Sequence, residues 1–138
     1  MPIDDAERAR RRKLLDAHYA AENDHDLERI LRTFSSGAEM IYNRQTFGDR
    51  DAIAQAHVYI GFAAGGAFGE LRTLRDHDHF TDDEIVVEGR LCGKHVGEFQ
   101  GFAPSGRDVE LPFVAFYRFD AAGKLTSERV VMNLGVLI

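Results

Sequence analysis

The chain has 138 residues but only one cysteine, Cys92, and no tryptophan. A single cysteine excludes an intramolecular disulfide and is typical of proteins from a reducing compartment, so we expect a cytoplasmic protein. No segment approaches the ~20 consecutive apolar residues that cross a bilayer, and no apolar segment follows the basic residues near the N-terminus. We therefore expect neither a membrane span nor a secretion signal.

Basic residues are outnumbered by acidic ones. The sequence has 17 Lys and Arg against 23 Asp and Glu, a net charge of −6. This balance argues against nucleic acid as a partner, because phosphate binding needs a basic surface. The sequence also lacks a GxGxxG motif, a P-loop, a CxxC pair and an HExxH motif. We expect no cofactor, because the sequence contains none of these motifs for nucleotide binding, thiol-redox chemistry or zinc-protease activity.

One pair of histidines has the spacing of metal ligands. His77 and His79 flank Asp78 in a segment with strand character, so their side chains share a face. A metal site needs a third ligand converging on that face, and the sequence specifies none. The sequence therefore predicts no metal site.

The apolar patterns predict one domain over residues 1–138, with helices first and strands afterwards. Apolar residues at helical spacing predict a helix over 4–21 and a second from 27 to about 35–37. A strand is expected over 39–47, followed by a third helix that is capped by Asp49 and ends within 61–66. Strands are then expected over 71–80, from 85 onward, and over 125–136.

The region from 88 to 119 predicts two long strands joined by a bend at 101–106. After the bend, Val109, Leu111, Phe113, Ala115 and Tyr117 alternate with a second row that is also largely apolar in its middle. We expect this strand to be covered on both faces. The element order α-α-β-α-β-β-β-β is that of an α+β domain with helices on one face of a curved, mostly antiparallel sheet.

Two histidines lie on apolar faces. His57 falls on the apolar stripe of the third helix, where a core histidine with one hydrogen bond competes with a pocket residue. His95 stands between Leu91 and Phe99 on the strand before the bend. If the sheet encloses a pocket, His95 is its first candidate for chemistry.

Several short motifs resemble one family. The segments GKHVGEFQG at 93–101, PSGR at 104–107, FYRF at 116–119 and GKL at 123–125 resemble the SnoaL-like (polyketide cyclase-like) branch of the nuclear transport factor 2-like superfamily. The resemblance implies a cone-shaped fold, with three N-terminal helices packed on a strongly curved sheet. It also implies acid–base chemistry on small molecules, with the family's histidine at His95.

Two family aspartates have no counterpart in this chain. The family's catalytic aspartate precedes the FYRF-like segment, where this chain has Ala115, and a further family aspartate falls at about Asn133. An amide there can polarise a carbonyl but cannot act as a base. We expect His95 as the catalytic residue and an apolar pocket between sheet and helices. The expected pocket residues are Tyr19, Tyr42, His57, Tyr59, Phe113, Ala115, Tyr117 and Asn133.

Two functions remain open at this stage. The first is an enzyme acting on an apolar, oxygenated ring-type substrate by cyclase-, isomerase- or hydrolase-like chemistry. The second, favoured by Ala115, is a non-catalytic domain that binds a hydrophobic small molecule or serves dimerisation. We also expect a homodimer, because Val114 and Phe116 lie on the face away from the pocket.

Overall fold

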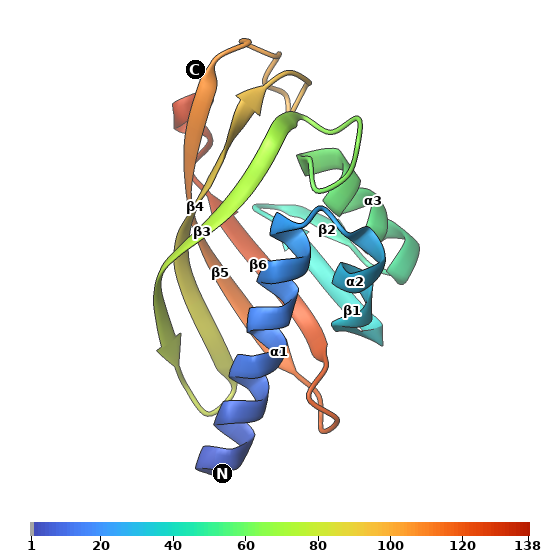
Figure 1. Ribbon diagram of the computed structural model, residues 1–138, viewed down its shortest axis with the longest axis vertical. Helices are drawn as coiled ribbons and strands as arrows, with labels where there is room; N and C mark the ends of the chain where they lie inside the picture. Colours follow the sequence, from blue (N-terminus) through green and yellow to red (C-terminus); the bar gives the residue numbers. More distant parts are fainter. Residues whose placement is uncertain (1) are drawn as a thin grey trace.

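A computed structural model describes residues 2–138 as a curved sheet with helices on its concave side (Figure 1). The elements, in chain order, are α1 (Asp5–Asn23), α2 (Leu27–Arg32), β1 (Phe34–Tyr42), β2 (Gln45–Phe47), α3 (Arg50–Ile60), β3 (Phe68–Phe80), β4 (Glu84–His95), β5 (Asp108–Phe119), β6 (Leu125–Met132) and the short 3-10 helix η1 (Leu134–Leu137).

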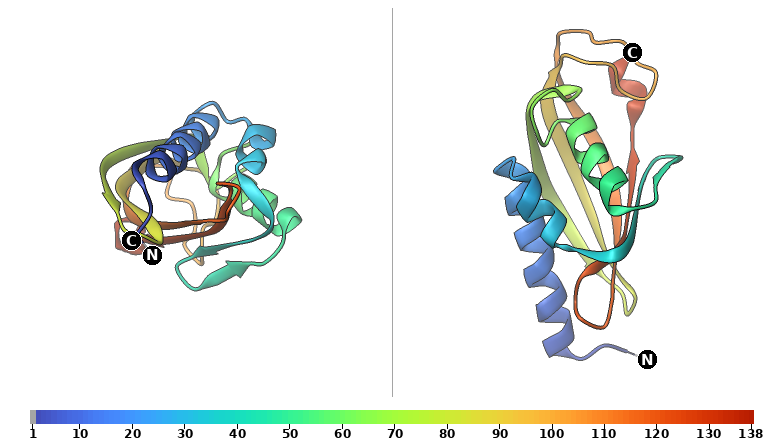
Figure 2. Two further views of the ribbon diagram at one scale, coloured as in Figure 1. Left: turned by 90° about the horizontal axis from the view of Figure 1, so that it is seen from below. Right: turned by 90° about the vertical axis from the view of Figure 1, so that its right-hand side faces the viewer.

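The six strands form one sheet in the order β2-β1-β6-β5-β4-β3. All neighbours are antiparallel except β1 and β6, which run parallel. Figure 2 shows the sheet curling so that α1 lies across its open side, with α2 and α3 beside it. The predicted α+β cone with a mostly antiparallel sheet is confirmed.

The helix starts follow from aspartate caps. The side chains of Asp4, Asp26 and Asp49 accept hydrogen bonds from backbone N–H groups three residues later, at the starts of α1, α2 and α3. Each such cap stabilises its helix by about 1 kcal/mol. The predicted cap at Asp49 is confirmed.

Element boundaries differ from the prediction at several places. The second helix ends at Arg32, and β1 already begins at Phe34, which pairs with Leu125 of β6. β4 ends at His95, before the bend predicted at 101–106. The predicted strand over 39–47 is two strands, since Asn43 adopts a positive φ of 54° at a tight turn. The last strand ends at Met132, where Asn133 caps η1 by accepting a hydrogen bond from the Gly135 N–H.

The predicted alternation in β5 is confirmed on its inner face. Its inner row, from Val109 to Tyr117, is buried, whereas Glu110, Pro112 and Arg118 on the outer face are exposed. The expectation that both faces are covered is therefore wrong within this chain, because helices pack only on the concave side. On the inner face, Gly89 leaves room for the Phe113 ring, whose atoms would lie 2.7 Å from a Cβ at that position.

No helix of the described residues is long and apolar enough to cross a membrane.

Candidate active site

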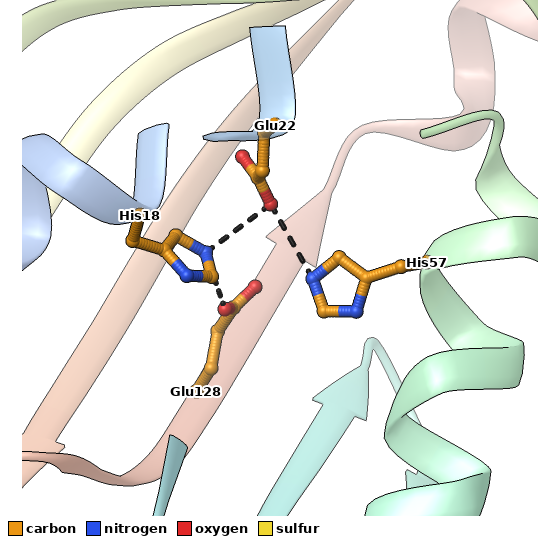
Figure 3. A group of neighbouring side chains, drawn as sticks. All are labelled: His18, Glu22, His57 and Glu128. Carbon is orange, nitrogen blue, oxygen red and sulfur yellow. Dashed lines mark ion pairs between the residues drawn. The ribbon is translucent and has the colours of Figure 1, made fainter. Parts of the chain in front are cut away.

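Four ionisable side chains meet inside the cone: His18 and Glu22 from α1, His57 from α3 and Glu128 from β6 (Figure 3). The i, i+4 spacing places His18 and Glu22 on the buried face of α1. On β6, the period of two turns Glu128 inward together with Val130 and Met132. All four are buried, with Glu22 and Glu128 only 4% and 2% exposed. We call these four residues the buried cluster.

His18 is oriented by Thr33. The Thr33 hydroxyl donates to the Ile30 carbonyl at 2.6 Å, so it accepts from His18 Nδ1 at 2.8 Å. The proton is therefore on Nδ1, and Nε2 points into the cluster. It lies 3.2 Å from Glu22 Oε2 and 3.1 Å from Glu128 Oε1, at angles that fall short of hydrogen bonds.

His57 has the same orientation relative to the cluster. Its Nδ1 lies 2.8 Å from the Ile53 carbonyl oxygen, which can only accept, so Nδ1 carries a proton. Its Nε2 faces Glu22 Oε2 at 3.5 Å. Both descriptions that the sequence left open for His57 therefore apply, because it has one core hydrogen bond and also faces the cluster.

The cluster perturbs the protonation of its members. Burial opposes a charge on His18, but the charges of Glu22 and Glu128 outweigh it and raise the pKa of His18 to about 10. Burial likewise opposes ionisation of Glu22, yet the charge of His18 outweighs it and lowers the pKa of Glu22 to about 2. His18 and Glu22 thus form a buried ion pair.

A tyrosine pair adjoins the cluster. The hydroxyls of Tyr19 and Tyr117 lie 2.5 Å apart. Burial and the charge of Glu22 raise the pKa of Tyr19 well above its ordinary value, and burial and Glu128 do the same for Tyr117. Both hydroxyls therefore keep their protons. One proton forms the bond between them, which leaves the other for a ligand oxygen.

A small cavity lies against these groups. Its polar lining comes from Tyr19, Glu22, Tyr42, Thr73, Tyr117 and Glu128. Its apolar lining comes from Ile60, Phe62, Leu91, Phe113 and Val130. The volume open to the centre of a water-sized sphere is about 20 Å³, room for about one water molecule. In this conformation the cavity is too small for a ring-type molecule.

The structure brings together some of the predicted pocket residues. Tyr19, Tyr42, Phe113 and Tyr117 line the cavity, and His57 belongs to the adjoining cluster. Tyr59 lies elsewhere, with its hydroxyl accepting from the Gln100 N–H at 2.5 Å. Asn133 is exposed beside a groove on the outer face of the sheet.

Ala115 and Glu128 are related through the sheet. Ala115 is fully buried on the inner row of β5, opposite Val130, while its neighbour Tyr117 is opposite Glu128. Glu128 is therefore the diagonal neighbour of Ala115 on the same face. The carboxylate that the family resemblance places at Ala115 is absent, but one from the adjacent strand lies next to that position.

His95 lies at the far end of β4. Its ring is fully buried and stacks on Phe68, with the ring centroids 5.1 Å apart, and neither ring nitrogen has a hydrogen-bond partner among residues 2–138. Leu91 lines the cavity, but His95 is four residues further along the strand, a rise of about 13 Å. His95 does not line the cavity, and its catalytic role stays a prediction.

Three cluster residues were missed as site candidates: His18, Glu22 and Glu128. Signals for them were present in the sequence. His18 and Glu22 fall on the apolar stripe of the first helix, and Glu128 shares the parity of Val130 and Met132 in the last strand. An ionisable residue on a face that is otherwise apolar is the pattern to search for, because burial without a partner is costly.

The comparisons with known proteins agree with this architecture. The SnoaL-like domain family matches residues 15–128. None of the curated proteins matches the sequence.

Three solved structures are similar to the chain. A candidate SnoaL-like polyketide cyclase from Jannaschia sp. CCS1 is 24% identical, with a TM-score of 0.73 over 97% of this chain and 90% of that one. A candidate polyketide cyclase from Xanthomonas campestris pv. campestris is 18% identical, with a TM-score of 0.80 over 96% and 99%. SalBIII, an epoxide hydrolase/cyclase-like enzyme of pyran ring formation in salinomycin, is 15% identical, with a TM-score of 0.76 over 94% and 95%.

At these identities the three structures establish the fold alone. The family match goes further, because it spans most of the chain, from α1 to the Glu128 position on β6. The protein belongs to the SnoaL-like domain family.

Proposed function

We propose that the protein is an acid–base enzyme for an apolar, oxygenated ring-type small molecule, with cyclase-, isomerase- or hydrolase-like chemistry. The observation that carries this proposal is the buried cluster beside the Tyr19–Tyr117 pair, in an otherwise apolar interior. Proton acceptors and a proton donor then face one cavity, as general acid–base catalysis requires. The single free cysteine, Cys92, supports a cytoplasmic setting for this enzyme.

An aldol-type ring closure illustrates which step each group would perform. A carboxylate, for which Glu128 is the candidate, removes a proton from the carbon next to a carbonyl group. The resulting enolate carbon attacks a second carbonyl carbon of the same molecule, and the new alkoxide takes up a proton. The spare hydroxyl proton of the Tyr19–Tyr117 pair is placed to hydrogen-bond the developing oxyanion.

The cavity walls favour an apolar substrate. Ile60, Phe62, Leu91 and Phe113 contribute side chains without hydrogen-bonding groups. Because the cavity holds about one water molecule, a ring-type substrate needs these side chains to move apart before it binds. We expect substrate binding to be coupled to such an opening.

The test is a screen of polycyclic phenols and ketones, read by native mass spectrometry for binding and by product analysis for turnover. Glu128→Gln removes the base while keeping the shape of the side chain, and should lower turnover by at least ~100-fold. Glu88→Gln is the matched control, because Glu88 pairs with His79 on the exposed surface at 2.6 Å. Full turnover by Glu128→Gln would contradict the proposal.

The alternative is a non-catalytic domain that binds a hydrophobic small molecule. The water-sized cavity and the missing carboxylate at Ala115 favour it. Under this alternative, the same screen detects binding that Glu128→Gln changes, but no product forms with any compound.

A further inference from the structure

We infer that His18, Glu22, His57 and Glu128 form a binding site for one divalent transition-metal ion, of the Zn²⁺ or Co²⁺ type. One ligand atom from each residue lies within 4.8 Å of all the others. The inference goes beyond the proposed acid–base function and does not depend on it. The sequence predicted no metal site, because these donors are far apart in the chain.

Three of the donor atoms have ion-pair contacts of 3.1–3.5 Å but lack hydrogen-bond geometry. His18 Nε2, His57 Nε2 and Glu128 Oε1 are buried and make no hydrogen bond within the described residues. Leaving a buried polar atom unsatisfied costs about 1–3 kcal/mol, so three at one point need an explanation. A metal ion at the centre of the cluster satisfies all three at once.

The two histidines are oriented as metal ligands are. Each carries its proton on Nδ1 and donates it outward, His18 to Thr33 Oγ1 and His57 to the Ile53 carbonyl. Such outer hydrogen bonds fix the ring and leave Nε2 to face the ion. Both Nε2 atoms point into the cluster toward Glu22 Oε2.

The spacing and the charge fit a small dication. Tetrahedral bonds of about 2.0–2.1 Å hold neighbouring ligand atoms about 3.3–3.4 Å apart. The three closest N···O contacts are 3.1, 3.2 and 3.5 Å. Two neutral imidazoles and two buried carboxylates also balance a charge of +2, whereas a proton on His18 neutralises only one of them.

A metal and a proton on His18 Nε2 are mutually exclusive, since they use the same lone pair. The metal-loaded protein is therefore a different state from the ion pair described above, and in that state Glu128 is a metal ligand and not the general base. Glu22 and Glu128 also line the cavity, so an ion held by them would lie at its wall. An ion there would polarise a carbonyl oxygen of a bound molecule.

The experiment uses chelator-treated full-length protein titrated with Co²⁺ and with Zn²⁺. We expect one ion per chain by calorimetry and a visible Co²⁺ absorption typical of a tetrahedral site. Glu22→Gln and His57→Asn should each weaken binding by about 100-fold or more, because loss even of outer-shell partners costs 10- to 100-fold. His79→Gln, which alters the exposed His79–Glu88 pair, should bind as the wild type does.

A second measurement uses only the wild-type chain, so it does not depend on the variants folding. Crystals soaked in Zn²⁺ and measured at the zinc edge should show an anomalous peak among the four side chains. A peak only at His77 or His79 on the surface, or no binding in the titration, would overturn the inference. A failed turnover screen would not, because neither metal measurement involves a substrate.

Discussion

The hydroxyl groups of Tyr19 on α1 and Tyr117 on β5 share a hydrogen bond of 2.5 Å, across 98 residues of sequence. The bond joins the helix that covers the cone to the centre of the sheet. It also places two hydroxyls at the cavity that Glu22 and Glu128 line. The same contact thus contributes to the fold and to the candidate site.

The tyrosine pair predicts non-additive effects on stability. Tyr19→Phe or Tyr117→Phe leaves the remaining buried hydroxyl without its partner, which costs about 1–3 kcal/mol. The double variant removes both groups and should cost less than the sum of the single ones. Urea unfolding of the four proteins measures this coupling, and strictly additive changes would show that the bond contributes nothing.

Asn23 predicts a stability effect at the end of α1. Its side chain accepts from the Thr73 N–H at 2.7 Å and donates to the Thr73 carbonyl at 3.0 Å. Asn23→Ala loses both bonds and should lower the free energy of unfolding by about 1–3 kcal/mol. Asn133→Ala, which loses one exposed bond to the Gly135 N–H, is the control and should cost less. Equal losses in chemical denaturation would contradict this role of Asn23.

The diagonal relationship of Ala115 and Glu128 predicts that a carboxylate can be relocated between the strands. Ala115→Asp alone adds a third buried carboxylate to Glu22 and Glu128 and should destabilise the protein more than Ala115→Asn does. Combining Ala115→Asp with Glu128→Gln restores the wild-type number of two buried carboxylates and should recover part of both stability and turnover. Thermal unfolding and the product assay follow the recovery. A double variant that is worse than either single one would contradict the relationship.

The homodimer stays a prediction. On the outer face, Val114 pairs with Val131, which is 45% exposed, and Arg129 covers the Phe116 ring at 4.4 Å. We expect this face to bury itself against a second copy of the chain. Sedimentation equilibrium should give a dimer at tens of micromolar and a monomer for Val131→Glu. A wild-type monomer at that concentration would remove the prediction.

The fold could be predicted from the sequence because its signals are local. The position of Asp49 before an apolar stripe predicted the start of α3. The inner row of β5 was predicted from apolar residues that recur at every second position. Predicted boundaries were wrong where pairing between distant segments decides them. Phe34, which the sequence placed in the second helix, begins β1 and pairs with Leu125 of β6.

The site was harder to predict because it depends on how far along each element a residue lies. His95 was correctly expected to face inward on β4, but periodicity gives the face and not the height, and its ring stacks on Phe68 instead. His18 and Glu22 share one helix, yet Glu128 and His57 join them only through packing of β6 and α3. A local pattern cannot supply that convergence.

The central claim is that the chemistry belongs to the buried cluster. The most direct test compares Glu128→Gln with His95→Gln in the same turnover assay, using circular dichroism to confirm that both variants fold. We predict that Glu128→Gln, which removes the candidate base at the cavity, loses at least ~100-fold in turnover, the lower end of acid–base catalysis, while His95→Gln stays near the wild type. The opposite outcome, a loss confined to His95→Gln, would contradict the account and return the catalytic role to the histidine beside Phe68.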